Sequence, residues 1–234
     1  MIKENVSRIR QRILKVCSKI NQDPGKIAII AVSKGRALEQ IKQAVEAGIT
    51  DIGENRVQEA LLKYNNLTPN AQYLTPIKWH MVGHLQTNKV KDTVKIFDLI
   101  QSIDSMRLAE EIDKEAAKIN KIQDILIEIK TSPEESKFGL KADEAIKVII
   151  GLTKFKNINI KGLMTIAPVV DNPEKARPYF RMLRELRNMI NGSAVMGYEL
   201  GVLSMGMTDD FEIALEEGSN MVRLGRAIFE GRNR

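Results

Sequence analysis

The sequence predicts a (β/α)8 barrel, the TIM barrel of the α/β class, preceded by one extra N-terminal helix. Short apolar runs rich in β-branched residues alternate with segments whose apolar residues recur every three or four positions. Eight such alternations in 234 residues match a compact barrel with a parallel sheet inside and helices outside. An open doubly wound sheet is the competing architecture, but it usually carries a glycine-rich loop after its first strand, and residues 33–36 contain no GxGxxG pattern.

The elements follow from the pattern in chain order. Apolar residues at helical spacing from Val6 to Ile20 predict the N-terminal helix, which Asp23-Pro24-Gly25 ends. The predicted strands are the apolar runs Ile27–Lys34, Ile49–Glu54, Ile77–Gly83, Phe97–Ile103, Asp124–Lys130, Ile158–Ile166, Leu200–Gly206 and Met221–Phe229. The predicted helices cover about 38–48, 57–62, 90–96, 105–119, 142–152, 173–190 and 209–217. No linker or low-complexity segment divides the chain, so we expect a single domain over residues 1–234.

Composition is typical of a soluble globular protein, with 43% hydrophobic and 28% charged residues. Cys17 is the only cysteine, which excludes an internal disulfide and a thiolate metal cluster and suits a reducing cytoplasm. No apolar run has the length of a transmembrane helix, and residues 1–20 lack the apolar core of a signal peptide. We therefore expect a cytoplasmic protein with no membrane partner.

The net charge of +6 permits binding to phosphates or nucleic acid but does not require it. Because this charge is spread along the chain with no aromatic stacking motif, we expect no nucleic-acid partner, and a basic nucleic-acid-binding protein stays an alternative of another class. His80 and His84 are four residues apart, but no HExxH motif is present and the segment begins as a strand. We expect no metal site.

Lys34 lies where the first strand meets a turn. Six of the first seven positions of Ile27–Lys34 are Ile, Ala or Val, so the amine follows a strand buried on both faces. Partial desolvation at such a position would lower the lysine pKa, and a neutral amine can attack a carbonyl to form a Schiff base. Most strand-ending lysines simply point into solvent, so this position alone does not decide between the two.

Two turns of small residues follow the last two strands. Residues 204–208 join the seventh strand to a helix, and Gly225 with Arg226 follows the eighth. Barrel enzymes often bind phosphate there, although these glycines could also serve only to permit tight turns. In a closed barrel the first and eighth strands are neighbours, so Lys34 and this phosphate cup would share one mouth. Pyridoxal 5'-phosphate (PLP) requires that combination of lysine and phosphate site.

Motifs from the first strand to the last carry a family resemblance. They are residues 31–34, 53–59, 79–89, 102–105, 135–139, 162–164, 203–210 and 222–225. With these motifs the chain resembles the pyridoxal phosphate homeostasis protein family, which is similar to the barrel domain of alanine racemase. The resemblance implies that Lys34 carries PLP as an internal aldimine, and that Asn55 and His80 lie near the cofactor ring. It also implies that Arg223 faces the pyridine nitrogen.

The resemblance implies further that Ser204, Gly225 and the backbone of Arg226 hold the phosphate. Arg226 departs from the family pattern, which usually has a small residue here, so a hydroxyl contact is lost or replaced by a guanidinium. Glu128-Ile129-Lys130 likewise replaces the usual Gln-Val-Asn, so any contact from those positions is in doubt. Lys130 could be a second amine near the site or a solvated strand end.

Members of this family are known as PLP-binding proteins of vitamin B6 and amino-acid balance, without an established reaction. We therefore expect a non-catalytic carrier, a monomer, whose partners are PLP, amino acids or other amines, and apo-enzymes that need PLP. A guanidinium opposite the pyridine nitrogen cannot accept its proton, which makes the ring a poor electron sink, although racemases work with arginine there. Related enzymes take an acid/base group from a C-terminal β-domain, and this sequence ends at Arg234. A PLP-dependent racemase or lyase is the alternative.

Overall fold

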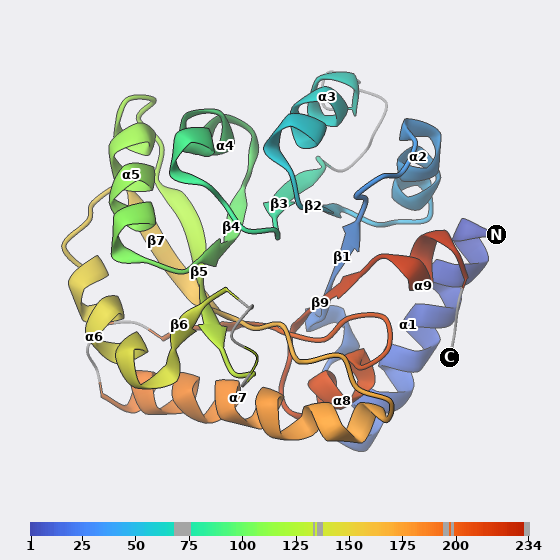
Figure 1. The fold of residues 1–234 in the computed structure, drawn as a ribbon. Coiled ribbons are helices and arrows are strands. Elements are labelled where there is room, and N and C mark those ends of the chain that lie inside the picture. Colours follow the sequence, from blue (N-terminus) through green and yellow to red (C-terminus); the bar gives the residue numbers. More distant parts are fainter. Residues whose placement is uncertain (68–75, 133, 135–137, 194–196, 198, 232–234) are drawn as a thin grey trace.

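In the computed structural model, eight parallel strands close into a barrel with helices around it (Figure 1). The structure describes residues 1–67, 76–132, 134, 138–193, 197 and 199–231. The barrel strands are β1 (Ala28–Val32), β2 (Asp51–Glu54), β3 (Lys78–Met81), β4 (Leu99–Ile103), β5 (Gln123–Lys130), β7 (Ile158–Met164), β8 (Val202–Ser204) and β9 (Met221–Leu224). Their order is β4-β3-β2-β1-β9-β8-β7-β5, and the pairing of β4 with β5 closes the sheet. The predicted barrel is confirmed.

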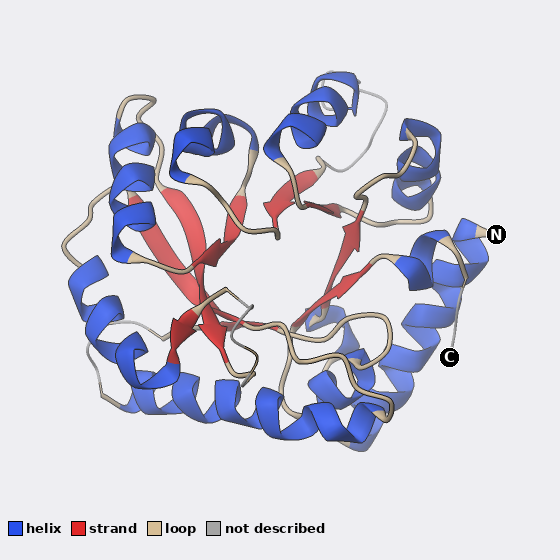
Figure 2. Ribbon diagram, in the orientation of Figure 1, coloured by secondary structure: helices blue, strands red, loops and turns tan. Residues whose placement is uncertain are grey.

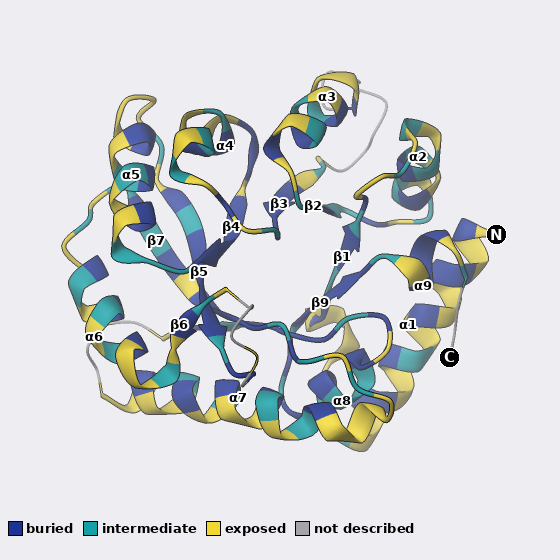
Figure 3. Ribbon diagram, viewed as in Figure 1, coloured by how far each residue is buried: buried dark blue, intermediate teal, exposed yellow. Residues whose placement is uncertain are grey.

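Helices surround the strands, as Figure 2 shows in blue around red. They are α1 (Ile2–Lys19), α2 (Leu38–Glu46), α3 (Val57–Leu67), α4 (Val90–Ile96), α5 (Met106–Ala117), α6 (Ala142–Leu152), α7 (Arg177–Gly192), α8 (Phe211–Glu216) and α9 (Arg226–Phe229). Their apolar stripes face the strands and their outer faces are exposed (Figure 3). The spacing of apolar residues therefore identified α1 to α8, and α9 was not predicted.

The end of the chain differs from the prediction. The strand expected over Met221–Phe229 ends at Leu224, and the remaining residues form the short helix α9. The amides of Ile228 and Phe229 donate to the carbonyl of Gly225 at 3.1 and 3.0 Å, so the chain turns at this glycine. A short apolar run has no period that separates a strand from a buried helical turn, which explains the wrong boundary.

The extra N-terminal helix covers the outside of the seam between the first and last strands. Figure 1 shows α1 beside α8 and α9, and the two side chains Arg12 and Asn5 fasten it there. Arg12 donates to both carboxylate oxygens of Glu212 at 3.0 and 3.1 Å, and Asn5 donates to the carbonyl of Ile228 at 2.8 Å. Within the described part of the chain, none of the helices is both long and apolar enough to cross a bilayer.

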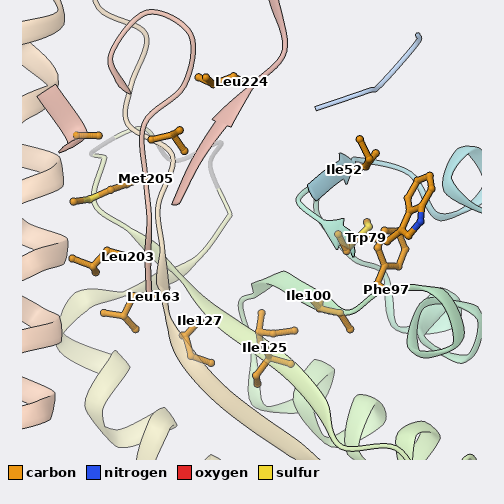
Figure 4. Packing of buried hydrophobic residues seen from close by; sticks show 14 of the residues in the cluster. Ile52, Trp79, Phe97, Ile100, Ile125, Ile127, Leu163, Leu203, Met205 and Leu224 are labelled. Atoms are coloured by element: carbon orange, nitrogen blue, oxygen red, sulfur yellow. The ribbon is translucent and has the colours of Figure 1, made fainter. Parts of the chain in front are cut away.

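Two apolar clusters make the core, one on each side of the sheet. The larger lies between strands and helices and includes the fully buried Trp79 (Figure 4). The smaller consists of Ile30, Val82, Leu99, Leu126, Met164 and Met221. Its members alternate along their strands with members of the larger cluster, so they point into the barrel. The inward positions not filled by these apolar residues are available to polar groups.

Candidate functional site

The β1–β9 seam brings the two predicted halves of the site together. Ala31 of β1 pairs with Leu224 of β9 in a parallel register, so Ser33 and Lys34 emerge beside Gly225. The expectation that the first and last strands become neighbours is therefore confirmed. Both segments leave the barrel at the carboxyl ends of their strands, where barrel proteins carry their functional groups.

Lys34 occupies a tight turn beyond the end of β1. The amide of Arg36 donates to the carbonyl of Ser33 at 2.9 Å, and Gly35 adopts φ +67°, which favours glycine. Lys34 is exposed, and its Nζ contacts no hydrogen-bonding or charged group of the described residues. Of the two possibilities that the sequence left open at this position, the structure has the solvent-facing lysine, because the turn buries Ser33 and leaves Lys34 exposed.

Arg223 lies inside the barrel, two residues before Gly225, and is only 4% exposed. Its Nη1 donates to the carbonyl and to the hydroxyl of Ser204 at 2.8 and 2.7 Å, and its Nη2 donates to the carbonyl of Thr165 at 2.8 Å. Among the described residues, none accepts a hydrogen bond from Nε. Burial lowers the pKa of Arg223 to about 10, against the attraction of Glu128 and Asp210, so the guanidinium stays charged at neutral pH.

A chain of hydrogen bonds crosses the barrel interior from Arg223. The Ser204 hydroxyl accepts from Arg223 and donates to Oε1 of Gln101 at 2.6 Å, which leaves no hydroxyl proton for a phosphate. Gln101 Nε2 lies 3.1 Å from Nδ1 of His80, and Nε2 of that histidine lies 2.9 Å from Oδ1 of Asp51. Because the amide donates to Nδ1, the imidazole proton sits on Nε2 and points at Asp51. Sequence reasoning missed Gln101, which no motif marks.

This chain changes what His80 and Ser204 can do. Both nitrogens of His80 and the one hydroxyl proton of Ser204 are already used by protein groups. These side chains therefore orient Arg223 rather than offer donors at the mouth. Burial would raise the pKa of Asp51, but the hydrogen bonds from His80 and Thr50 outweigh it and lower that pKa.

The two loops expected to form the phosphate cup are tied to each other. The hydroxyl of Thr208 accepts from the amide of Ala227 at 3.3 Å, and the guanidinium of Arg226 pairs with Asp209. The Arg226 side chain therefore bridges the loops rather than replacing a phosphate-binding hydroxyl. Its amide opens the first turn of α9, where amides have no acceptor within the helix.

The two glycines of these loops have different reasons to be glycine. Gly206 has φ +94°, and a Cβ there would lie 2.6 Å from Cβ of Ala214 and 2.9 Å from Cα of Phe211. Backbone conformation and packing thus explain Gly206. A Cβ on Gly225 would lie no closer than 3.4 Å to the carbonyl oxygen of Val32, an ordinary contact. The turn alone does not require a glycine at this position.

Glu128 faces the barrel interior from β5. It is 5% exposed and makes no hydrogen bond with a described residue. Burial and the nearby Asp104 raise its pKa to about 7, against the attraction of Arg223. Lys130, two residues on, lies beside the backbone of Gly139 and is half-buried. Lys137, the other lysine of this region, lies outside the described residues.

Asn55 lies at the end of β2, the strand that pairs with β1 on the side away from β9. A Cβ on Gly83 would lie 2.5 Å from the carbonyl oxygen of Asn55, so the loop after β3 rests directly on this residue. Asn55 is half-buried and, with Gln86 and Lys89, lines a cavity of about 170 Å³. The structure thus places Asn55 on the rim, in contact with the β3–α4 loop.

His84 has partners different from those of His80. Its Nδ1 lies 3.1 Å from Oδ2 of Asp104, and its ring stacks on Phe138 with centroids 3.7 Å apart. The two histidines therefore do not converge. Within the described ranges, no group of three or more His, Cys, Asp or Glu side chains could hold a metal ion.

Comparison with known proteins gives a consistent family. The model of the alanine racemase N-terminal domain matches residues 2–233. Pyridoxal phosphate homeostasis proteins of Aquifex aeolicus and Escherichia coli K12 are 40% and 31% identical, covering 97% and 99% of this chain and 96% and 97% of their own lengths.

The structures agree. PipY of Synechococcus elongatus PCC7942 with PLP bound is 31% identical, with a TM-score of 0.85 over 98% of this chain and all of that one. Alanine racemase of Clostridium difficile 630 shares the fold at 16% identity and a TM-score of 0.72, over 94% of this chain and 58% of that one. The chain therefore belongs to the pyridoxal phosphate homeostasis proteins of the alanine racemase N-terminal domain family.

Proposed function

We propose that this protein binds PLP through Lys34 and serves the homeostasis of PLP and amino acids. The observation that carries the proposal is the β1–β9 seam, where the exposed amine of Lys34, the turn at Gly225 and the buried Arg223 meet. When bound, PLP supplies an aldehyde whose carbon bonds to a neutral lysine nitrogen with the release of one water. The names of the relatives and the PLP in PipY support the same cofactor.

The side chains present fit that cofactor on three counts. Lys34 offers an amine with no partner among the described residues. Arg223 is buried, and its Nε donates to no described residue. This N–H group is suited to donate to an aromatic nitrogen. Gly225 has no side chain, so a phosphate could approach its backbone closely, whereas the turn itself does not require a glycine here. The amine, the donor for the ring nitrogen and the space for the phosphate thus lie at the ends of two neighbouring strands, β1 and β9.

The remaining residues would support these three. Ser204, Gln101 and His80 hold Arg223 in place across the barrel. The amide of Arg226, at the start of α9, would bind a phosphate oxygen, while its side chain joins the two loops. Asn55 would contact the cofactor from the end of β2, next to the strand that carries Lys34.

We propose a carrier rather than an enzyme. Arg223 stays protonated at neutral pH and so cannot take a proton from a ring nitrogen, which leaves that ring a weak electron sink. The homeostasis names of the relatives support the same view. A racemase or lyase stays the second candidate because Glu128, with a pKa of about 7, could exchange a proton inside the mouth.

The test of the binding proposal is the visible spectrum of the purified protein with added PLP, before and after borohydride reduction. We expect an absorbance band that borohydride removes, and mass spectrometry should place the reduced adduct on Lys34. Lys34→Ala should lose both, whereas the matched control Lys130→Ala keeps both. A fully reducible adduct in Lys34→Ala would show that another lysine is used, with Lys130 and Lys137 the next to test.

We further propose that the protein is a monomer and that amines and apo-enzymes requiring PLP receive the cofactor from it. The exposure of Lys34 supports exchange, because a second amine can reach that position from solvent. Light scattering measures the molar mass in solution, and a mass equal to two chains of 26.4 kDa would contradict the monomer.

A further inference from the structure

A buried ion-pair cluster of Lys63, Glu54 and Glu59 lies beneath the turn that carries Lys34. Nζ of Lys63 lies 2.5 Å from Oε1 of Glu54 and 2.7 Å from Oε1 of Glu59. The side chains of Lys63 and Glu54 are only 7% and 0% exposed, which is rare for charged residues unless they are paired. Glu54 ends β2, and α3 supplies the other two residues one helical turn apart.

The cluster holds the backbone on both sides of Lys34. Before it, Lys63 donates to the carbonyl of Ser33 at 2.6 Å, and the Ser33 hydroxyl donates to Glu54 at 2.5 Å. After it, the amide of Gly35 donates to Oε1 of Glu59 at 2.6 Å. The backbone around Lys34 is therefore fixed at two points, and the Ser33 side chain at a third, while the Lys34 side chain stays free to meet a ligand.

Fold stability alone does not explain this cluster. Well-packed apolar residues often stabilise a protein as much as a buried ion pair does, because charges lose hydration on burial. One oxygen, Oε2 of Glu54, is buried with no hydrogen-bond partner among the described residues. Burial raises the pKa of Glu54, and the hydrogen bonds from Lys63 and Ser33 offset this only in part. A cluster with such an unsatisfied atom is better explained by what it holds.

We propose that Lys63 is a positioning residue that sets the orientation of Lys34 toward the aldehyde of PLP. The inference rests on the proposed function, because it gives the Lys34 turn its purpose. With the turn fixed, the Lys34 amine approaches the aldehyde carbon from one direction. Without Lys63, the carbonyl of Ser33 and both carboxylates lose their common partner, and the turn samples other orientations.

The test separates covalent attachment from binding of the rest of the molecule. Lys63→Met is titrated with PLP, reading the borohydride-reducible adduct, and with pyridoxine 5'-phosphate, which carries an alcohol in place of the aldehyde. We expect PLP attachment to weaken at least tenfold and pyridoxine 5'-phosphate binding to change less than twofold. Lys121→Met is the matched control, since Lys121 binds the carbonyls of Val94 and Phe97 at 2.8 and 2.7 Å and should leave both titrations unchanged.

Glu59→Ala is the second variant, in case Lys63→Met does not fold. Its side chain is 29% exposed, and its loss frees the amide of Gly35, so we expect PLP attachment to weaken at least threefold with the same selectivity. Equal weakening of both ligands, or no change in either, overturns the inference. Persistence of the reducible adduct in Lys34→Ala would instead overturn the proposed function. If Lys34→Ala loses the adduct but Lys63→Met and Glu59→Ala bind PLP as the wild type does, only the inference is overturned.

Discussion

The carboxyl group of Glu128 lies inside the barrel, where burial raises its pKa and the positive charge of Arg223 lowers it. Its pKa is raised from 4.5 to about 7 by burial and by Asp104, and Arg223 counteracts this only in part. An acid whose pKa is raised on folding holds its proton more tightly in the native state than in the unfolded chain. The free energy of unfolding should therefore fall as the pH rises from about 4.5 through 7.

Glu128→Gln should remove this loss. The shift from 4.5 to about 7 corresponds to at most about 3 kcal/mol of stability lost by the wild type at pH 8 relative to pH 4.5. Urea unfolding of both proteins at pH 5 and pH 8 measures it, and the wild type should lose more stability over that interval. Parallel pH dependence of the two proteins would show that Glu128 ionises normally.

At the residue scale, the sequence predicted the groups that form the mouth better than their contacts. Lys34, Gly225 and Arg223 were expected together and lie on adjacent strands. The link from Arg223 through Ser204 to Gln101 was not predictable, because Gln101 belongs to no motif and meets Ser204 only when β4 and β8 face each other across the barrel. Long-range contacts of this kind depend on closure of the sheet, which leaves no local pattern.

At the element scale, the loop between β8 and α8 depends on Gly206. A side chain at φ +94° is strained, and a Cβ would lie 2.6 Å from Cβ of Ala214 in α8. We expect Gly206→Ala to lower the free energy of unfolding by about 2–4 kcal/mol. Urea denaturation measures the change.

Gly192→Ala is the matched control for that substitution. Gly192 is the last residue of α7, and a Cβ there would meet nothing within 4 Å. Because alanine favours a helix more than glycine does, this variant should be unchanged or more stable by up to about 1 kcal/mol. A similar loss in both variants would mean that the strain assigned to Gly206 is not specific to its loop.

Element types followed from the sequence more securely than element ends. The long helices were predicted from their period, whereas β9 and α9 were merged because Met221–Phe229 is apolar throughout. The two-residue strand β6 (Leu140–Lys141) was not predicted, since its pairing with β5 comes from the fold rather than from a local preference. Tertiary contacts therefore decided the ends that periodicity left open.

At the scale of the whole molecule, the barrel separates two kinds of interior. Apolar residues such as Ile30 and Leu126 fill part of it, and the polar chain that ends at Arg223 crosses the rest. The outer helices have no part in that chain. Ser204, Gln101 and His80 of this interior are thus linked to one guanidinium that keeps its proton at neutral pH, which is the arrangement that the carrier proposal invokes.

This arrangement predicts that the purified, PLP-loaded protein racemises and transaminates amino acids no faster than free PLP does. The cation at Arg223 contributes to this expectation, because it cannot accept a ring-nitrogen proton and so weakens the ring as an electron sink. Since racemases work with arginine there, turnover has to be measured directly. Chiral chromatography of L- and D-alanine after prolonged incubation measures racemisation, and 2-oxo acid formation measures transamination. Turnover at ordinary enzymatic rates that depends on Lys34 would contradict the carrier proposal. If Glu128→Gln also lost this turnover, the Glu128 carboxylate would be identified as the proton-exchanging group.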